Sequence, residues 1–216
     1  MAEGRVRIKF CGIKRLKDVK LALELGVDAL GFIFYPLSPR VISITDAREI
    51  AQTLPPFVTK VGVFVDSSTP VIAQVVERVG LELVQLCGDE SVEMAAQLPC
   101  PFVKVFRELP SAAELMSFTR CENFRGFVAD GKPERPTAAN QYGGSGQAAA
   151  RDLVLGLQKA GRLILAGGLT PDTVAAAAAD YRPYAVDVSS GIESAPGVKS
   201  PKKMREFVAA VESLRP

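Results

Sequence analysis

The sequence contains no histidine and no tryptophan among its 216 residues. Histidine is the side chain most often used as a general base and is a frequent metal ligand, so any acid–base chemistry here must rest on other groups. The four cysteines, Cys11, Cys87, Cys100 and Cys121, form no CxxC pair. Without histidine, this spacing argues against a zinc site. We therefore expect reduced thiols, as in a cytoplasmic protein, and no metal.

The sequence also lacks an excess of charge of either sign and a long apolar run. Its 26 basic and 24 acidic residues leave a net charge of +2, which argues against a nucleic-acid-binding surface. No run approaches the roughly 18 apolar residues of a membrane span. The opening "MAEGRVRIKF" lacks the apolar stretch of a signal peptide. A cytoplasmic protein with neither a membrane nor a nucleic-acid partner is expected.

Short apolar segments are abundant, and eight of them recur along the chain. Hydrophobic residues make up 48% of the sequence and aromatic ones only 7%, so the core is built mainly from Val, Leu, Ile and Ala. Most of the runs are continuous rather than alternating, as is typical of parallel strands buried on both faces. They span residues 6–10, 29–34, 60–65, 81–86, 102–106, 124–129, 162–166 and 184–189.

The segments between these runs have helical patterns. Residues 15–26 place apolar side chains on one face and end at Gly26, and Thr-Pro or Ser-Pro pairs predict helix starts at residues 69, 170 and 200. Eight strand–helix units predict an α/β fold, a (β/α)8 TIM barrel, with residues 1–216 as a single domain. The alternative is an open doubly wound sheet, but "KFCGIK" after the first run lacks the GxGxxG turn expected there.

Glycine and serine clusters follow the strands near the end of the chain. They read "YGGSG" (142–146), "AGGL" (166–169) and "VSSG" (188–191). Glycine lets backbone N–H groups approach an anion, and barrels commonly hold a phosphate between the loops after strands seven and eight. Each cluster alone is equally consistent with a tight turn. Together they predict a phosphate site and a sugar-phosphate substrate, with the candidate residues Gly144, Ser145, Gly167, Gly168, Ser189 and Ser190.

Three chemically reactive side chains stand at other strand ends. Cys11 ends the first strand, Asp130 ends the sixth, and Arg40 lies in the loop after the second. Each has a plainer interpretation: a buried thiol, a turn aspartate and a solvated surface charge. Arg7 and Lys9 share strand parity with Cys11, and nearby cations lower the pKa of a thiol. On one barrel rim, the three would form an acid–base pair with an anion clamp.

Taken together, these segments resemble the phosphoribosylanthranilate isomerases, (β/α)8 enzymes of tryptophan biosynthesis. The resemblance covers essentially the whole chain and includes "KFCGIK", "DALGFIFYPLSPRVIS", "PPFVTKVGVFV", "LVQLCGDE", "YGGSG", "LAGGLTPDTV" and "RPYAVDVSSGIES". It implies an Amadori rearrangement of N-(5-phosphoribosyl)anthranilate to 1-(2-carboxyphenylamino)-1-deoxyribulose 5-phosphate, without metal or organic cofactor.

The resemblance also implies roles for individual residues. Cys11 matches the general base of the family, Asp130 the general acid, and Arg40 the residue that holds the anthranilate carboxylate. The phosphate is expected on the glycine and serine loops. Asp187 is assigned to substrate binding, orienting a sugar hydroxyl or a cation inside the barrel.

The sequence departs from the family pattern in three places. Cys87 stands where the family usually has a histidine, so the polarity of the pocket is expected to differ. The polar stretch from Asp130 to Tyr142 is longer than expected and suggests a loop that folds over the substrate. "QAAARDL" (147–153) replaces the usual Phe-Asp-Trp, which predicts weaker packing of the sixth helix.

Two other functions remain compatible with the sequence. One is a different phosphate-binding barrel enzyme, a lyase or synthase, although such enzymes typically use lysine or glutamate at strand ends. The other is a barrel that binds a sugar phosphate without catalysis, which would be expected to have lost Cys11 or Asp130. An oligomer is possible, and the sequence does not decide between monomer and dimer.

Overall fold

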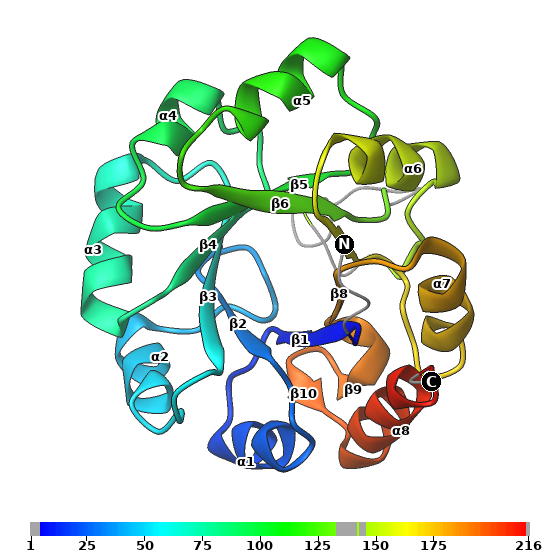
Figure 1. The fold of residues 1–216 in the computed structure, drawn as a ribbon. Coiled ribbons are helices and arrows are strands. Elements are labelled where there is room, and N and C mark those ends of the chain that lie inside the picture. Colours follow the sequence, from blue (N-terminus) through cyan, green and yellow to red (C-terminus); the bar gives the residue numbers. More distant parts are fainter. Residues whose placement is uncertain (1–4, 133–141, 143–145, 215–216) are drawn as a thin grey trace.

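The computed structural model describes residues 5–132, 142 and 146–214. Eight parallel strands of this part of the chain close into a barrel, and helices surround it (Figure 1). The strands are β1 (Arg7–Cys11), β2 (Ala29–Ile33), β3 (Thr59–Phe64), β4 (Leu83–Leu86), β5 (Phe102–Phe106), β6 (Phe124–Ala129), β7 (Leu163–Leu165) and β8 (Ala185–Val188). The predicted TIM barrel is confirmed, and the open doubly wound sheet is excluded.

The helices lie between the strands in the order that the sequence pattern predicted. They are α1 (Leu16–Glu24), α2 (Ile44–Ala51), α3 (Thr69–Val79), α4 (Val92–Ala96), α5 (Ala112–Thr119), α6 (Arg151–Ala160), α7 (Val174–Tyr181) and α8 (Pro201–Glu212). After β8 the chain forms a 3-10 turn (Ser190–Ile192) and a short hairpin of β9 (Glu193–Ala195) and β10 (Val198–Lys199). The sequence pattern did not predict this hairpin.

Serine side chains begin several of the helices. Ser43, Ser91, Ser111 and Ser200 each accept a hydrogen bond from a backbone N–H in the first turn, which satisfies one of the groups that a helix start leaves unpaired. One predicted start was wrong. The α7 helix begins at Val174 rather than near Thr170, because Thr170 and Thr173 hydrogen-bond to each other in a turn before it.

The closing strand pair determines which side chains enter the barrel. Strand β1 pairs with both β2 and β8, and Lys9 lies opposite Asp187 in the latter pair. Phe10 packs edge-on against Phe207 of α8, so it faces the outer layer. Because side chains alternate along a strand, Lys9 and Cys11 face the interior. Arg7 shares their parity but is exposed at the start of β1 and stacks over the ring of Tyr184, so of the two cations expected beside Cys11 only Lys9 influences the thiol.

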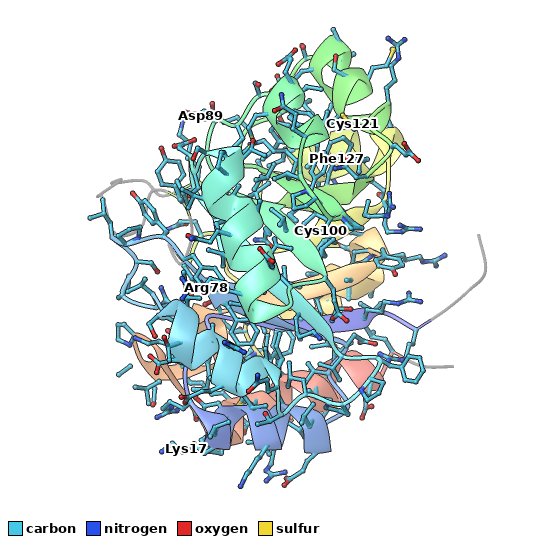
Figure 2. All side chains as sticks on the ribbon, turned by 90° about the vertical axis from the view of Figure 1, so that its left-hand side faces the viewer. Lys17, Arg78, Asp89, Cys100, Cys121 and Phe127 are labelled. Atoms are coloured by element: carbon cyan, nitrogen blue, oxygen red, sulfur yellow. The ribbon has the colours of Figure 1, made fainter. Side chains whose placement is uncertain are left out.

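Two apolar clusters hold the fold together. The larger one fills the space between the strands and the helices, where buried side chains from all eight helices pack against the barrel (Figure 2). The smaller one contains Cys11, Val63, Cys87, Val105 and Val128 and lies inside the barrel. No helix in the part of the chain that the structure describes is long and apolar enough to span a membrane.

Candidate active site

A pocket opens at the carboxyl ends of the strands. Its lining comes from the ends of β1, β2, β3, β4, β6, β7 and β8, where barrel chemistry is expected. All of the predicted site residues within the described ranges line this one pocket: Cys11, Arg40, Asp130, Gly167, Gly168, Asp187, Ser189 and Ser190. Gly144 and Ser145 lie outside the described residues, as does most of the long stretch before Tyr142.

Cys11 is buried at the end of β1, against the backbone of β2. A Cβ atom added to Gly31 would lie 2.9 Å from the Cys11 sulfur and 3.2 Å from Cε of Lys9, so glycine leaves room for both side chains. Burial raises the pKa of the Cys11 thiol, and the Lys9 ammonium offsets only part of this rise. The sequence correctly suggested a cation beside the thiol. It did not reveal that burial outweighs that cation.

Lys9 and Asp187 form a buried ion pair across the β1–β8 seam. Lys9 Nζ lies 2.6 Å from Asp187 Oδ2, and both side chains are almost completely covered. Burial opposes the charge on Lys9, but the nearby Asp187 and Cys11 outweigh it and raise the pKa of Lys9. The other carboxylate oxygen, Asp187 Oδ1, is buried and accepts no hydrogen bond from any described residue. Asp187 thus pairs with a cation through one carboxylate oxygen, while the other has no partner among the described residues.

Asp130 follows β6 and is held by its neighbours on two sides. Its Oδ1 accepts a hydrogen bond from the N–H of Gly131 at 2.8 Å, and Arg107 Nη2 lies 3.4 Å from its Oδ2. Burial raises the pKa of Asp130, and the positive charge of Arg107 opposes this without cancelling it. A carboxyl group with a raised pKa is suited to act as a proton donor.

Arg107 was missed by the sequence analysis, although it directly follows the fifth apolar run. Besides contacting Asp130, it donates hydrogen bonds to the carbonyl oxygens of Cys87 at 2.9 Å and Tyr142 at 2.5 Å. It therefore links the ends of β4, β5 and β6. The position after a barrel strand is the signal that could have identified it.

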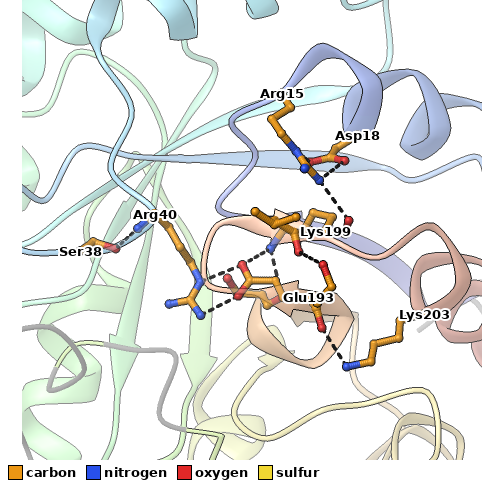
Figure 3. Close-up of polar contacts among 10 residues, drawn as sticks. Arg15, Asp18, Ser38, Arg40, Glu193, Lys199 and Lys203 are labelled. Atoms are coloured by element: carbon orange, nitrogen blue, oxygen red, sulfur yellow. Dashed lines mark hydrogen bonds and ion pairs between the residues drawn. The ribbon is translucent and has the colours of Figure 1, made fainter.

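Arg40 is buried rather than solvated, at 7% exposure. Its Nε and Nη2 donate to the two carboxylate oxygens of Glu193 at 2.9 and 2.8 Å, and Lys199 Nζ donates to the same carboxylate at 2.9 Å (Figure 3). Both partners come from the hairpin after β8. Neither was predicted, because nothing in the local sequence marks that hairpin as part of the site.

The loops after β7 and β8 are tightly packed turns. Gly167 and Gly168 have φ angles of +78° and +62°, which side chains with a Cβ rarely adopt. A Cβ on Gly167 would lie 2.4 Å from the backbone nitrogen of Gly131, and one on Gly191 would lie 1.8 Å from the carbonyl oxygen of Leu169. The Oγ of Ser189 is buried and has no partner among the described residues. This concave backbone with an unpaired hydroxyl is suited to bind an anion.

Comparison with known proteins agrees with this arrangement. The sequence model of a family described as N-(5′-phosphoribosyl)anthranilate (PRA) isomerase matches residues 8–210. An N-(5′-phosphoribosyl)anthranilate isomerase from Geotalea uraniireducens is 41% identical over 210 residues, which cover 96% of this chain and 99% of the relative. One from Myxococcus xanthus is also 41% identical and covers 97% of each chain. The chain belongs to this isomerase family.

Solved structures of phosphoribosylanthranilate isomerases have the same architecture. The crystal structure from Thermus thermophilus is 39% identical and has a TM-score of 0.84, with 97% of this chain and 100% of that chain covered. Another, in complex with reduced 1-(o-carboxyphenylamino)-1-deoxyribulose 5-phosphate, is 35% identical and has a TM-score of 0.79 over the same coverage. The prediction of an isomerase of tryptophan biosynthesis is confirmed. The two competing functions, another class of barrel enzyme and a barrel without catalysis, were wrong.

Cys87 gives the pocket of this family member a second buried thiol. Gln85 Nε2 lies 3.5 Å from its sulfur, and burial raises the pKa of Cys87 to about 12. The thiol is therefore neutral over the physiological range. In the described part of the chain, no group of three or more cysteine, aspartate or glutamate side chains is placed to hold a metal ion. Cys87 acts as a small, uncharged part of the wall.

Proposed function

We propose that the chain converts N-(5-phosphoribosyl)anthranilate to 1-(2-carboxyphenylamino)-1-deoxyribulose 5-phosphate, with Cys11 as general base and Asp130 as general acid. The observation that carries the proposal is the shared pocket. A thiol, a carboxyl group with a raised pKa and two glycine- and serine-rich loops suited to bind an anion line the same cavity. The relative crystallised with a reduced form of this product supports the choice of substrate.

The two proton transfers account for the rearrangement. Asp130 donates a proton to the furanose ring oxygen, the C1–O bond breaks, and the nitrogen lone pair forms an iminium ion. The Cys11 thiolate then removes the proton from C2, which the iminium has made acidic. The resulting enolamine tautomerises to the aminoketose. A positioned proton-transfer group of this kind typically contributes about 10²–10⁴-fold in rate.

Three parts of the pocket are proposed to hold the substrate. The phosphate binds on the loops containing Gly167, Gly168, Ser189 and Ser190. The anthranilate carboxylate binds the guanidinium of Arg40. A sugar hydroxyl donates to Asp187 Oδ1, which is otherwise buried without a partner. Two of these contacts would give a hydrogen-bond partner to a buried polar atom that has none among the described residues, Ser189 Oγ and Asp187 Oδ1.

Fluorescence tests the proposed reaction directly. Freshly prepared N-(5-phosphoribosyl)anthranilate loses its emission as it is converted, so addition of the protein is expected to produce a decay whose initial rate is proportional to protein concentration. Buffer alone and heat-inactivated protein serve as controls. An unchanged signal with fresh substrate would rule out the proposed activity.

Replacing Arg40 with methionine is expected to raise KM for this substrate by about 10- to 100-fold. A hydrogen bond to a charged group contributes about 1.5–3 kcal/mol, and a tenfold change in affinity corresponds to about 1.4 kcal/mol. The kcat should change less, because the carboxylate lies away from the reacting atoms. Steady-state kinetics provide the measurement, with Arg48→Met on the exposed face of α2 as the control. An unchanged KM would assign the carboxylate to another residue.

Replacing Gly167 with alanine is expected to weaken phosphate binding and to lower the melting temperature. The added Cβ would collide with the backbone of Gly131, and the positive φ adds about 1–2 kcal/mol of strain. Gly80→Ala is a matched control, because Gly80 has a φ of +73° but nothing within 4 Å of an added Cβ. Calorimetric titration with inorganic phosphate and thermal melting would separate the two effects. Phosphate affinity equal in both variants would argue against this loop as the phosphate site.

A further inference from the structure

The hairpin formed by β9 and β10 is fixed against the barrel by several polar contacts. Lys203 Nζ donates to the carbonyl oxygen of Glu193 at 2.8 Å, and Arg15 Nη2 donates to the carbonyl oxygen of Lys199 at 3.0 Å (Figure 3). Lys199 Nζ also donates to the carbonyl oxygen of Ser189 at 3.0 Å. The hairpin is therefore tied to α1, to α8 and to the loop that follows β8. Two of these contacts hold the backbone of the hairpin and the third holds the side chain of Lys199.

The carboxylate of Glu193 lies between two buried cations. Glu193, Lys199 and Arg40 are only 6%, 2% and 7% exposed. Burial opposes the charge on Glu193, but its bonds with Arg40 and Lys199 outweigh this and lower its pKa, so it is ionised at neutral pH. Two cations then share one anion. Because isolated buried charge is strongly unfavourable, this cluster favours the binding of one more negative group.

The geometry of the Arg40–Glu193 ion pair leaves one nitrogen of the Arg40 guanidinium available. Glu193 engages Nε and Nη2 of Arg40, whereas Nη1 makes no hydrogen bond with any described residue. Because Nη1 has no such partner and yet is not one of the fully buried unpaired atoms, it is accessible, and Arg40 lines the pocket. Two hydrogen bonds along one edge of a planar guanidinium prevent its rotation, so the direction of the third nitrogen is fixed.

We infer that Glu193 is a positioning residue for substrate recognition: it holds the guanidinium of Arg40 so that Nη1 meets the carboxylate of the aromatic acid. Lys199 secures the Glu193 carboxylate from its other side and supplies the second positive charge. The inference rests on the proposed function, since it concerns the same substrate in the same pocket. It adds a specificity element from a hairpin that does not touch the reacting atoms.

The effect of Glu193→Gln on ligand affinity tests this inference. The probe is reduced 1-(o-carboxyphenylamino)-1-deoxyribulose 5-phosphate, which carries both the carboxylate and the phosphate, with inorganic phosphate as the second ligand. We expect the variant to weaken binding of the first about tenfold, to raise KM by a similar factor and to change kcat less than threefold. Binding of inorganic phosphate should be unchanged. Glu206→Gln removes the same charge from the exposed face of α8 and serves as the control.

A double-mutant cycle separates positioning from a general structural effect. If Glu193 acts through Arg40, Glu193→Gln should cause no further loss of affinity in an Arg40→Met background, because coupled residues are non-additive. The double variant Lys199→Met/Glu193→Gln keeps the net charge of the cluster and should show the same tenfold loss, so it replaces the single variant if that one fails to fold.

The outcomes are distinguishable. Unchanged affinity of Glu193→Gln for the reduced product, or an equal loss with and without Arg40, would overturn the inference alone. If the wild-type protein binds phosphate but neither binds the reduced product nor consumes the substrate, the proposed function fails and the inference with it.

Discussion

Replacing Cys11 with serine is expected to lower kcat by about 10²–10⁴-fold, the typical contribution of one proton-transfer group. Serine has nearly the same volume, but its hydroxyl does not ionise in the accessible pH range, so it cannot remove the C2 proton. The buried setting of Cys11 against Gly31 should accept the smaller oxygen without loss of fold. Stopped-flow or steady-state fluorescence with N-(5-phosphoribosyl)anthranilate provides the measurement.

A matched control is available in the same chain. Cys121 is a free cysteine just after α5 and does not line the pocket, so Cys121→Ser should leave kcat unchanged. The affinity of Cys11→Ser for reduced 1-(o-carboxyphenylamino)-1-deoxyribulose 5-phosphate should remain within a few-fold of the wild type. Full turnover in Cys11→Ser would move the base to another residue.

Replacing Asp130 with asparagine is expected to produce a loss of similar size, about 10²–10⁴-fold in kcat. The amide preserves the shape and can still accept the hydrogen bond from Gly131. It cannot donate a proton to the ring oxygen, so ring opening becomes slow. The control is Asp152→Asn on the exposed start of α6, which makes the same chemical change outside the pocket.

The pH dependence of kcat/KM checks both assignments, because it reports the pKa values of the free enzyme. The proposed mechanism requires Cys11 to be ionised and Asp130 to be protonated. The ordinary pKa of a thiol, about 8.5, lies well above that of an aspartate carboxyl, about 3.9, and burial raises the pKa of both Cys11 and Asp130. Below the pKa of Asp130 the activity should fall because the thiolate fraction decreases tenfold per pH unit. Above the pKa of Cys11 the activity should fall because the protonated carboxyl disappears. Between the two pKa values it should stay level, because the thiolate fraction rises with pH as fast as the protonated carboxyl fraction falls.

The pH profile of the Asp130→Asn variant tests whether these two groups act as a pair. In Asp130→Asn the requirement for a protonated carboxyl is gone, so the residual kcat/KM should rise with pH up to the pKa of Cys11 instead of staying level. A wild-type profile with a single ionisation, or a variant profile identical in shape to the wild type, would contradict the pairing of these two groups.

Much of the fold and part of the candidate site could be predicted from the amino-acid sequence. Continuous apolar runs predicted parallel strands, since both faces of such strands are buried, and helical periodicity between them predicted the alternating order. Barrel chemistry lies at the carboxyl ends of strands, so Cys11, Asp130, Gly167 and Ser189 could be located from their sequence positions alone. The start of α7 could not, because Thr170 and Thr173 form a turn that competes with the helix.

The ion-pair partners of the buried charged residues could be found only in the closed barrel. Asp187 was expected to orient a hydroxyl or a cation, but its partner Lys9 lies 178 residues away and meets it only through the β1–β8 seam. Arg40 was predicted to bind the substrate, and this stays a prediction. Its burial and its bidentate pairing with Glu193, 153 residues away, depend on the hairpin after β8. Sequence periodicity specifies which face of an element a side chain occupies. The pairing of distant charges, and the pKa values that follow from it, depend on strand register and on how deeply the assembled fold buries each group.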